Sequence, residues 1–390
     1  MSKTLQDYAT LINDTIQSNE INHYITTANM CQNLGGIDTF KNINIPQGKV
    51  RSFQKDDVLL SNIRLYFRKV YRAKQKGGCS SDVLVFRAKH IDSATLFAIL
   101  SSQIFTDYAC SGSQGSKMPR GNKTHMMDFK IPTINFTIAK IFNSIQNKIE
   151  NNHKINELLH KILELLYEQY FVRFDFLDEN NKPYQTSGGK MKFSKELNRL
   201  IPNDFEVKTL GELITWISGS QPPKSCHIYE HKEGYIRFIQ NRDYSSNNYI
   251  TYIPISKNNK ICYQYDIMID KYGEAGAVRF GLQGAYNVAL SKISVLNQSM
   301  QEYIRSYLNS KPIKKYLSNA CMASTRSSLN ENHIYFLMLP IPPINLLQKY
   351  EKIAKNIITA IINNNQSTQT LTALRDFLLP LLLKQQVKPK

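Results

Sequence analysis

The chain has 390 residues, and its 49 Lys+Arg against 31 Asp+Glu give a formal net charge of +18 at pH 7. This length is too great for one hydrophobic core, so two or three domains are expected. The charge favours a polyanion such as nucleic acid as partner, although a basic soluble protein rich in Lys, Asn and Ile is the alternative. The N-terminus lacks an apolar signal core, and the apolar runs are too short to span a bilayer, so no membrane association is expected.

The first 134 residues are predicted to form a globular domain of short strands, turns and a helical stretch. Residues 83–86 are strand-like and follow a predicted turn at Gly77 and Gly78, and residues 95–106 have helical spacing. Gly112, Gly115, Pro119 and Gly121 then predict a loop.

A long amphipathic helix is predicted over residues 135–170. This stretch contains no Gly or Pro, and its apolar residues recur at helical spacing. At 1.5 Å per residue the helix is roughly 50 Å long, so it needs a partner beyond one small domain. Leu159 and Leu163 are predicted to lie in its apolar seam, and Tyr170, Phe171 and Phe174 to belong either to a domain core or to a docking patch.

A connector over 171–204 leads to a second globular domain over 205–344, with strand-like runs at 249–255 and 277–280. A second helix is predicted over 345–384, followed by a tail over 385–390. A seven-residue repeat marks its predicted seam, with companion positions between; the two sets are Tyr350, Ile357, Asn364, Leu371 and Leu378, and Ile353, Ile361, Thr368 and Arg375.

Both helices have a polar middle, at 151–153 in the first and 363–366 in the second. If the helices pair antiparallel, these polar stretches meet, and this match favours a two-helix coiled coil. The alternative is two independent helices, each packed on its own domain.

Three pairs of similar segments lie at nearly one offset along the chain. They begin at Ile131 and Ile341, Asp57 and Asp266, and Leu100 and Leu308, and these starts are 210, 209 and 208 residues apart. A tandem duplication explains the offset. The predicted fold is therefore α+β, with two pseudo-repeated globular domains separated by two long helices that form an antiparallel coiled coil.

The chain offers only weak enzymatic patterns. Glycines at 273, 276, 281 and 284 fit neither G-x-G-x-x-G nor the P-loop, and turns explain them better. The string His227-Ile228-Tyr229-Glu230-His231, next to Cys226, matches a zinc-protease string, but the prolines before it and Gly234 after it argue against the helix that this chemistry needs. The six cysteines form no C-x-x-C, which indicates a reducing cytoplasm. No catalytic residue, cofactor or metal is predicted for this chain.

Several segments, in one order, resemble the specificity subunits of type I restriction–modification systems. They include residues 165–176 with 183–191, the phrase Phe205-Glu206-Val207-Lys208, residues 219–223 and 266–276, and the exit at 339–343. Pieces of the first half match as well, at 57–64, 115–120 and 131–132. Phe205 stands where the family usually has Trp. The resemblance covers essentially the whole chain.

The resemblance implies a non-catalytic subunit that binds double-stranded DNA and two methyltransferase subunits, with restriction subunits as further partners. S-adenosylmethionine and ATP would bind those partners. Each domain would be a target recognition domain that reads one half of an asymmetric bipartite target, and the helices would fix the gap. Two alternatives stay open: the recognition part of a fused restriction–methyltransferase enzyme, and an architectural DNA-binding scaffold without sequence preference.

Phosphate contacts need Lys and Arg, whereas base contacts favour Arg, Asn, Gln, Ser and Thr on loops. The candidates in the first domain are Arg64, Arg68, Lys69, Ser113, Gln114, Ser116, Lys117, Arg120 and Lys123. The candidates in the second domain are Gln221, Lys224, Arg237, Gln240, Arg242, Lys271, Arg279, Ser324, Thr325 and Arg326. For each of them the alternative is a solvated surface side chain.

Overall fold

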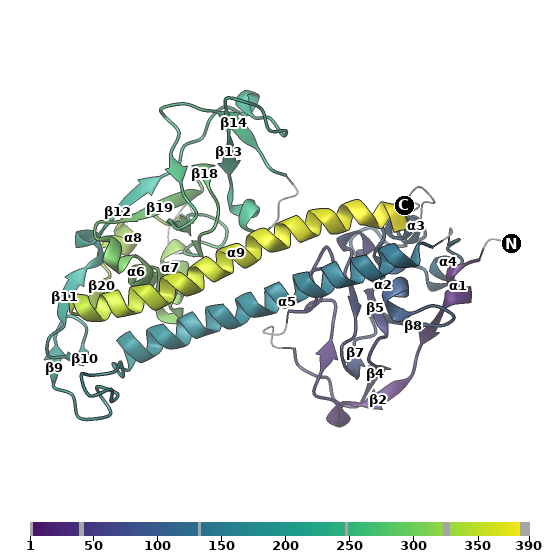
Figure 1. Ribbon diagram of the computed structural model, residues 1–390, viewed down its shortest axis with the longest axis horizontal. Helices are drawn as coiled ribbons and strands as arrows, with labels where there is room; N and C mark the ends of the chain where they lie inside the picture. Colours follow the sequence, from purple (N-terminus) through teal and green to yellow (C-terminus); the bar gives the residue numbers. More distant parts are fainter. Residues whose placement is uncertain (1–2, 39–42, 132–133, 246–248, 323–327, 383–390) are drawn as a thin grey trace. The chain divides into compact units, whose positions relative to one another are not determined.

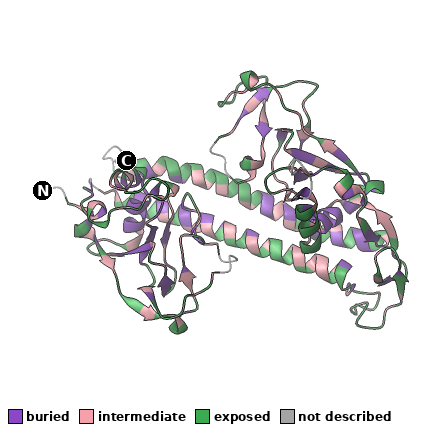
Figure 2. Ribbon diagram, turned by 180° about the vertical axis from the view of Figure 1, so that it is seen from behind, coloured by how far each residue is buried: buried purple, intermediate pink, exposed green. Residues whose placement is uncertain are grey.

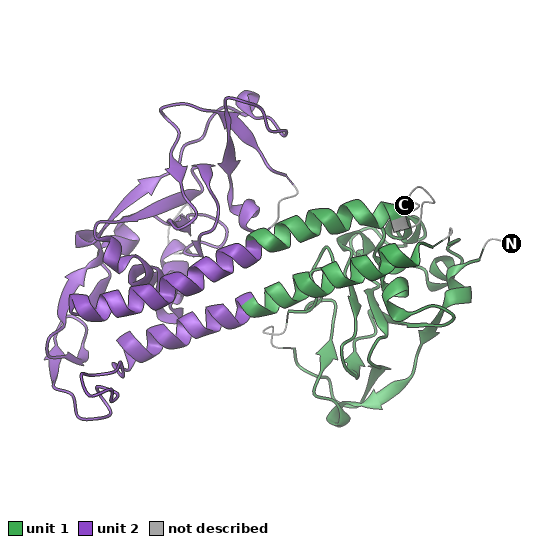
Figure 3. Ribbon diagram, viewed as in Figure 1, with its two compact units in different colours: residues 1–155, 366–390 green, residues 156–365 purple. Residues whose placement is uncertain are grey.

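The computed structural model describes residues 3–38, 43–131, 134–245, 249–322 and 328–382. The chain divides into two compact units (Figure 3): unit 1 comprises residues 1–155 and 366–390, and unit 2 comprises residues 156–365. Each long helix therefore contributes one half to each unit. The domain boundaries predicted from the sequence stay predictions.

Unit 1 begins with short strands and turns and continues into helices. Its elements are α1 (Leu5–Tyr8), β1 (Ala9–Ile12), β2 (Thr15–Gln17), η1 (Ser18–Glu20), β3 (Tyr24–Ile25), β4 (Lys49–Phe53), β5 (Val58–Ser61), η2 (Leu65–Phe67), β6 (Val70–Arg72), β7 (Gly77–Cys79), β8 (Val83–Ala88), α2 (Ser93–Ser101), α3 (Gln103–Ser111), α4 (Lys123–Met127) and the start of α5 (Phe136–Tyr167).

Unit 1 contains two four-stranded sheets and one main core. The first sheet has the order β1-β8-β5-β6 and is antiparallel throughout. One face of it packs on α2 and α5, where Leu60 and Phe86 join Leu96 and Phe142 in one hydrophobic cluster. The second sheet has the order β2-β4-β7-β3. The predicted turn at Gly77 and Gly78 is wrong: both are buried in β7, where a Cβ on Gly78 would come within 2.5 Å of Ile21.

Beyond the end of α5, unit 2 also begins with short strands and turns and continues into helices. Its elements are the end of α5, the π-helical turn η3 (Glu168–Val172), β9 (Met191–Ser194), β10 (Arg199–Pro202), β11 (Glu206–Thr209), η4 (Leu210–Glu212), β12 (Ile214–Ser218), η5 (Lys224–Cys226), β13 (Tyr235–Ile239), η6 (Asn241–Tyr244), β14 (Tyr252–Pro254), β15 (Ile261–Cys262), β16 (Ile267–Asp270), β17 (Val278–Arg279), β18 (Gly284–Tyr286), β19 (Leu290–Val295), η7 (Gln298–Met300), α6 (Gln301–Asn309), α7 (Lys311–Met322), α8 (Asn332–Tyr335), β20 (Met338–Ile341) and the start of α9 (Ile344–Leu382).

The main sheet of unit 2, β12-β19-β16-β17, has the same order and the same antiparallel pairing as the sheet β1-β8-β5-β6. It packs on α6 and α9, as the first sheet packs on α2 and α5, with Ile267 and Ile304 in one cluster with Tyr350 and Ala354. The chain is therefore a tandem repeat of one fold. Phe171 and Phe174, each 1% exposed, belong to the core of unit 2, which decides against a docking patch for these two.

The second sheets of the two units differ at their edges. In unit 1, β7 pairs with β4 antiparallel and with β3 parallel, and the outer strand β2 joins β4. In unit 2, β18 pairs with β15 antiparallel and with β13 parallel, but the outer strand β14 joins β13. The duplication therefore preserves the main sheet and diverges in the segment between its first and second strands along the chain.

In each unit α5 and α9 run antiparallel, and both are visible as the longest helices in Figure 1. In unit 1 the amide of Asn152 donates to Ser367 and Thr368, at 3.4 and 3.2 Å. In unit 2 Asn156 donates to Asn365 at 2.8 Å and accepts from Asn364 at 3.0 Å. The predicted meeting of the two polar middles is therefore confirmed.

The buried side of α9 matches the predicted seam at some positions and lies one position further along at others; Figure 2 colours the helix by burial. Tyr350, Ile361 and Arg375 are buried as predicted, but Ala354, Ile358, Ile362 and Leu379 are also buried and lie outside the predicted seam. Ile357, Leu371 and Leu378 are half-buried, as are Leu159 and Leu163 on α5, and Ile353 is exposed. A strict seven-residue period fails here because α9 packs on a domain on one side and on α5 on another. Among the described residues, no helix is long and apolar enough to cross a membrane.

Candidate nucleic-acid interface

The turn between β5 and β6 brings together residues that are far apart in the sequence. The backbone N–H of Arg64 donates to the carbonyl of Pro119 at 2.9 Å, and its guanidinium donates to the carbonyl of Lys117 at 3.3 Å. Gln114 and Arg120 exchange two backbone hydrogen bonds of 2.9 and 2.8 Å. The predicted loop is thus folded against the turn, and four predicted DNA-contacting residues, Arg64, Gln114, Lys117 and Arg120, lie in one loop cluster.

The turn between β16 and β17 is the counterpart of this turn in unit 2. Gly121 donates its N–H to the carbonyl of Asn62, and Leu329 donates its N–H to the carbonyl of Lys271. Asn62 and Lys271 are 209 residues apart, and Gly121 and Leu329 are 208 apart, as the duplication requires. The same segment therefore docks on the same turn in both copies.

In each unit a second loop also forms hydrogen bonds to the turn. In unit 1, Asn33 and Leu34 donate their N–H groups to the carbonyls of Phe67 and Arg68. In unit 2 the amide of Asn241, in η6, donates to the carbonyl of Tyr272 at 3.4 Å. Each unit thus carries a loop cluster built around the turn between the second and third main-sheet strands along the chain, β5–β6 in unit 1 and β16–β17 in unit 2.

The remaining candidates of unit 1 lie in or beside its loop cluster. Arg68 donates to the carbonyl of Ser101 at 2.9 Å, and the Lys69 ammonium donates to the carbonyl of Thr27 at 2.5 Å. Burial lowers the pKa of Arg68. Ser113 and Ser116 belong to the docked loop, and Lys123 is exposed at the start of α4. Arg120 forms an ion pair of 2.9 Å with Asp82.

The candidates of unit 2 are more dispersed. Gln240 and Arg242 flank Asn241 and so lie near Lys271, whereas Gln221 and Lys224 lie between β12 and β13, and Arg237 lies within β13. Arg279 pairs with Asp270 at 2.9 Å and with Glu274 at 2.5 Å, so it holds the turn together. Burial raises the pKa of Asp270. Ser324, Thr325 and Arg326 lie outside the described residues. DNA contact by each of these residues stays a prediction.

Exposed tyrosines in the loop clusters were missed from the sequence. Tyr66 lies in η2 and is 52% exposed, and Tyr272 is 43% exposed beside the Lys271 ammonium. Tyr249 is also exposed, and its ring lies 5.9 Å from the Arg242 guanidinium. A search limited to basic, amide, serine and threonine side chains passes over tyrosine, although the tyrosine ring can pack on apolar groups while its hydroxyl forms hydrogen bonds.

The His227–His231 string lies in a loop and not in a helix. Ile228 forms an isolated bridge with Tyr252, and the His231 ring packs edge-on against the Tyr252 ring at 5.4 Å. Among the described residues, no group of three or more His, Cys, Asp or Glu could hold a metal ion. The string therefore offers no zinc site of the protease type.

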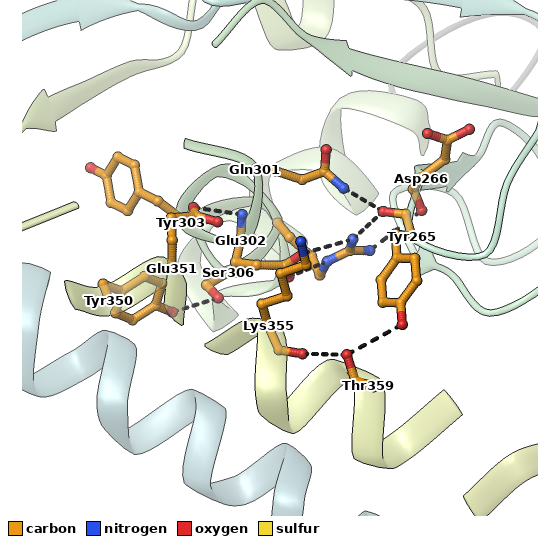
Figure 4. Close-up of polar contacts among 11 residues, drawn as sticks. Tyr265, Asp266, Gln301, Glu302, Tyr303, Ser306, Tyr350, Glu351, Lys355 and Thr359 are labelled. Atoms are coloured by element: carbon orange, nitrogen blue, oxygen red, sulfur yellow. Dashed lines mark hydrogen bonds and ion pairs between the residues drawn. The ribbon is translucent and has the colours of Figure 1, made fainter. Parts of the chain in front are cut away.

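A buried polar network links α9 of unit 2 to α6 and to the segment just before β16 (Figure 4). The Glu351 carboxylate on α9 accepts the backbone N–H groups of Glu302 and Tyr303, at 2.8 and 3.0 Å, where α6 begins. Arg305, one turn into α6, pairs with Glu302 at 2.7 Å and donates to the carbonyl of Tyr265. Glu302 and Arg305 are both buried, and burial raises the pKa of Glu351 to about 7.

Two equivalent loop clusters on a duplicated fold, in a chain with a net charge of +18, are the features of a DNA-binding protein. Residues 202–373 match the family model described as type I restriction modification DNA specificity domain. The type I restriction enzyme MjaIX specificity subunit of Methanocaldococcus jannaschii is 24% identical over 300 residues, which cover 74% of this chain and 67% of that protein. The HindI specificity subunit of Haemophilus influenzae is 23% identical over 310 residues, covering 64% of this chain and 66% of the relative.

Among solved structures, the type I restriction–modification S subunit from M. genitalium has the same fold, with a TM-score of 0.63. Sequence identity to it is 15%, and the match covers 99% of this chain and 96% of that one. Residues 202–373 thus carry the DNA specificity domain of type I restriction–modification systems, and the chain as a whole is similar to the specificity subunits of these systems. It is a DNA specificity subunit and is itself non-catalytic.

Proposed function

We propose that each recognition domain reads one half of an asymmetric bipartite target in double-stranded DNA. The observation that carries this proposal is the pair of equivalent loop clusters, which share one backbone hydrogen bond and a supporting loop but differ in their side chains. Because the two loop clusters have equivalent backbones, both can enter the same groove of DNA. Their different side chains would then select different bases. The divergent edge strands β2 and β14 add a further difference between the two domains.

The paired helices are proposed to fix the unspecified gap between the two half-sites. A helix of 32 residues, such as α5, is about 48 Å long, and one turn of DNA is about 34 Å. A stiff spacer of this length, less its overlap with the domains, can hold two readers about one turn apart. The polar contacts of Asn152 and Asn156 with α9 support one fixed register, because sliding the helices would leave these buried amides without their partners.

Outward-facing apolar residues on the helices are the proposed docking surfaces for two methyltransferase subunits. On α5 they are Leu158, Ile162 and Leu165, whose spacing places them on one face. On α9 they are Leu374 and Phe377, near the end of the helix. Leu165 and Leu374 are 209 residues apart, so the repeat supplies two related surfaces for two copies of one partner.

The partner subunits are proposed to supply the chemistry. Methyltransferase subunits would bind S-adenosylmethionine and methylate adenine, and restriction subunits would use ATP. The cytoplasmic location inferred from the scattered cysteines likewise stays a prediction.

The stoichiometry of the complex tests the docking surfaces. We expect two methyltransferase subunits per chain by native mass spectrometry, and one after Ile162→Asp, because the substitution places a charge within an apolar contact. Lys154→Asp, at an exposed position of the same helix, serves as the control and should retain both. Two bound subunits in the Ile162→Asp variant would contradict the placement.

A scaffold without sequence preference is the competing function, and the net charge of +18 favours it equally. The complex with its methyltransferase subunits should bind a target duplex at least 1,000-fold more tightly than random competitor DNA at fixed salt, on the order found for specific readers. Equal affinity for both DNAs would support the scaffold.

A further inference from the structure

The turn after β5 and the turn after β16 share an uncommon backbone conformation. In unit 1, Arg64 and Arg68 have φ of 51° and 49°, in the left-handed region. In unit 2, Gly273 and Gly276 have φ of 75° and 86°. Arg64 and Gly273 are 209 residues apart, and Arg68 and Gly276 are 208 apart, so the left-handed residues occupy equivalent positions.

Glycine is the expected residue at such positions, because a Cβ in the left-handed conformation crowds the following carbonyl and costs roughly 1–2 kcal/mol per residue. Unit 2 follows this rule, and at Gly276 a Cβ would also come within 2.8 Å of the Leu317 Cβ. Unit 1 instead places two arginines there. Strained residues of this kind persist mostly where function requires the side chain.

Each turn also exposes one large aromatic side chain close to its left-handed residues. Tyr66 lies between Arg64 and Arg68, and its ring packs edge-on against Phe67 at 4.6 Å. Tyr272 immediately precedes Gly273, with the Lys271 ammonium 6.0 Å from its ring. Both rings lie outside the hydrophobic cores, and both belong to turns that carry cationic residues, Arg64 and Arg68 in the first and Lys271 in the second.

We infer that Tyr66 and Tyr272 are specificity-determining residues, each reading bases of the half-site recognised by its own domain. This inference rests on the proposed function. A tyrosine ring offers an apolar edge to a thymine methyl group and a hydroxyl that can donate to or accept from a base, while the neighbouring cations hold the phosphates. Tyr66 and Tyr272 do not occupy equivalent positions within their turns, since Ile63 is the counterpart of Tyr272. The two domains therefore place a tyrosine at different positions of the same turn, so each would contact its DNA half-site differently.

The test is a map of methylated adenines in DNA from cells that express the chain with its methyltransferase subunits. Tyr66→Ala should relax the first half-site alone, and Tyr272→Ala the second alone. In competition binding, the discrimination against a wrong base pair should fall by about 5- to 100-fold at the affected half. Tyr316→Ala serves as the matched control, because Tyr316 is 44% exposed and lies on α7, outside the turns. Unchanged half-sites in both tyrosine variants would overturn the inference.

Two further variants separate a reading role from a structural one. Tyr66→Phe keeps the ring and should lose only the part of the discrimination that the hydroxyl provides. Arg64→Gly installs the residue of the second copy, so the melting temperature should hold or rise while binding to the first half-site weakens at least 5-fold. A lower melting temperature with normal recognition would assign the turn a structural role. A wild-type map without two separate half-sites would instead contradict the proposed function itself.

Discussion

Glu351 provides a direct test of how the second recognition domain is fixed to α9. Its carboxylate is largely buried and accepts two backbone N–H groups at the start of α6, next to the buried pair of Glu302 and Arg305. Burial, together with the charge of Glu302, raises its pKa from 4.5 to about 7. We therefore expect Glu351→Gln to stabilise unit 2 at alkaline pH, since glutamine retains a carbonyl oxygen for both N–H groups and carries no charge.

The sign follows from proton binding. Between pH 4.5 and 7 folded Glu351 holds a proton that the unfolded chain has released, so stability falls as pH rises through this window. The full difference in pKa corresponds to about 3 kcal/mol. Solvent screening at a side chain that is not fully buried, and the favourable charge at a helix N-terminus, lower the expected gain to about 1–2 kcal/mol at pH 8. At pH 5 the two proteins should differ by less than about 0.5 kcal/mol.

Trp216 makes the measurement local. It is the single tryptophan of the chain and lies in β12, in the hydrophobic cluster that includes Tyr350. Urea unfolding followed by its fluorescence at pH 5 and pH 8 gives the two free energies of unfolding. Glu230→Gln, at an exposed loop position, is the control and should show no such dependence on pH. A Glu351→Gln variant that is less stable than the parent at pH 8 would refute the reasoning.

Three further outcomes are expected. Arg375→Ala should destabilise unit 1 by about 3 kcal/mol in urea unfolding, because the buried guanidinium donates to the side chain of Gln146 and to a backbone carbonyl; a loss under about 1 kcal/mol would contradict this. Cys79 and Cys262, whose thiol pKa values burial raises to about 12, should resist alkylation at pH 8 until the protein unfolds; rapid labelling of the native protein would contradict their burial. Lys117→Ala should reduce the salt dependence of DNA binding by about one phosphate contact, and an unchanged slope would exclude Lys117 from the backbone interface.

The duplicated architecture was predictable because its signal is distributed over the chain. The shared offset of 208 to 210 residues identified the repeat, and uninterrupted helical spacing identified α5 and α9. The polar middles predicted antiparallel pairing correctly, because buried amides need partners and each helix could offer them only at one register.

Details that depend on tertiary packing were not predictable. The strand at Gly77 and Gly78 resembles a turn in sequence, and only the close approach of Ile21 and Val50 explains why glycine is required there. The buried side of α9 shifts from the predicted seam because a domain packs beside it, which one helical period does not encode. The exposed tyrosines of the loop clusters were missed because exposure and neighbours, rather than residue type, distinguish them from core tyrosines such as Tyr303.

A domain exchange tests most directly whether two different readers on one pseudo-symmetric scaffold set the target. Replacing residues 205–344 with a second copy of residues 1–134 gives a protein with two identical readers on antiparallel helices. Mapping methylated adenines should then reveal an inverted repeat of the first half-site with the gap unchanged. Persistence of the original second half-site in the hybrid would contradict the proposed division of recognition between the two domains.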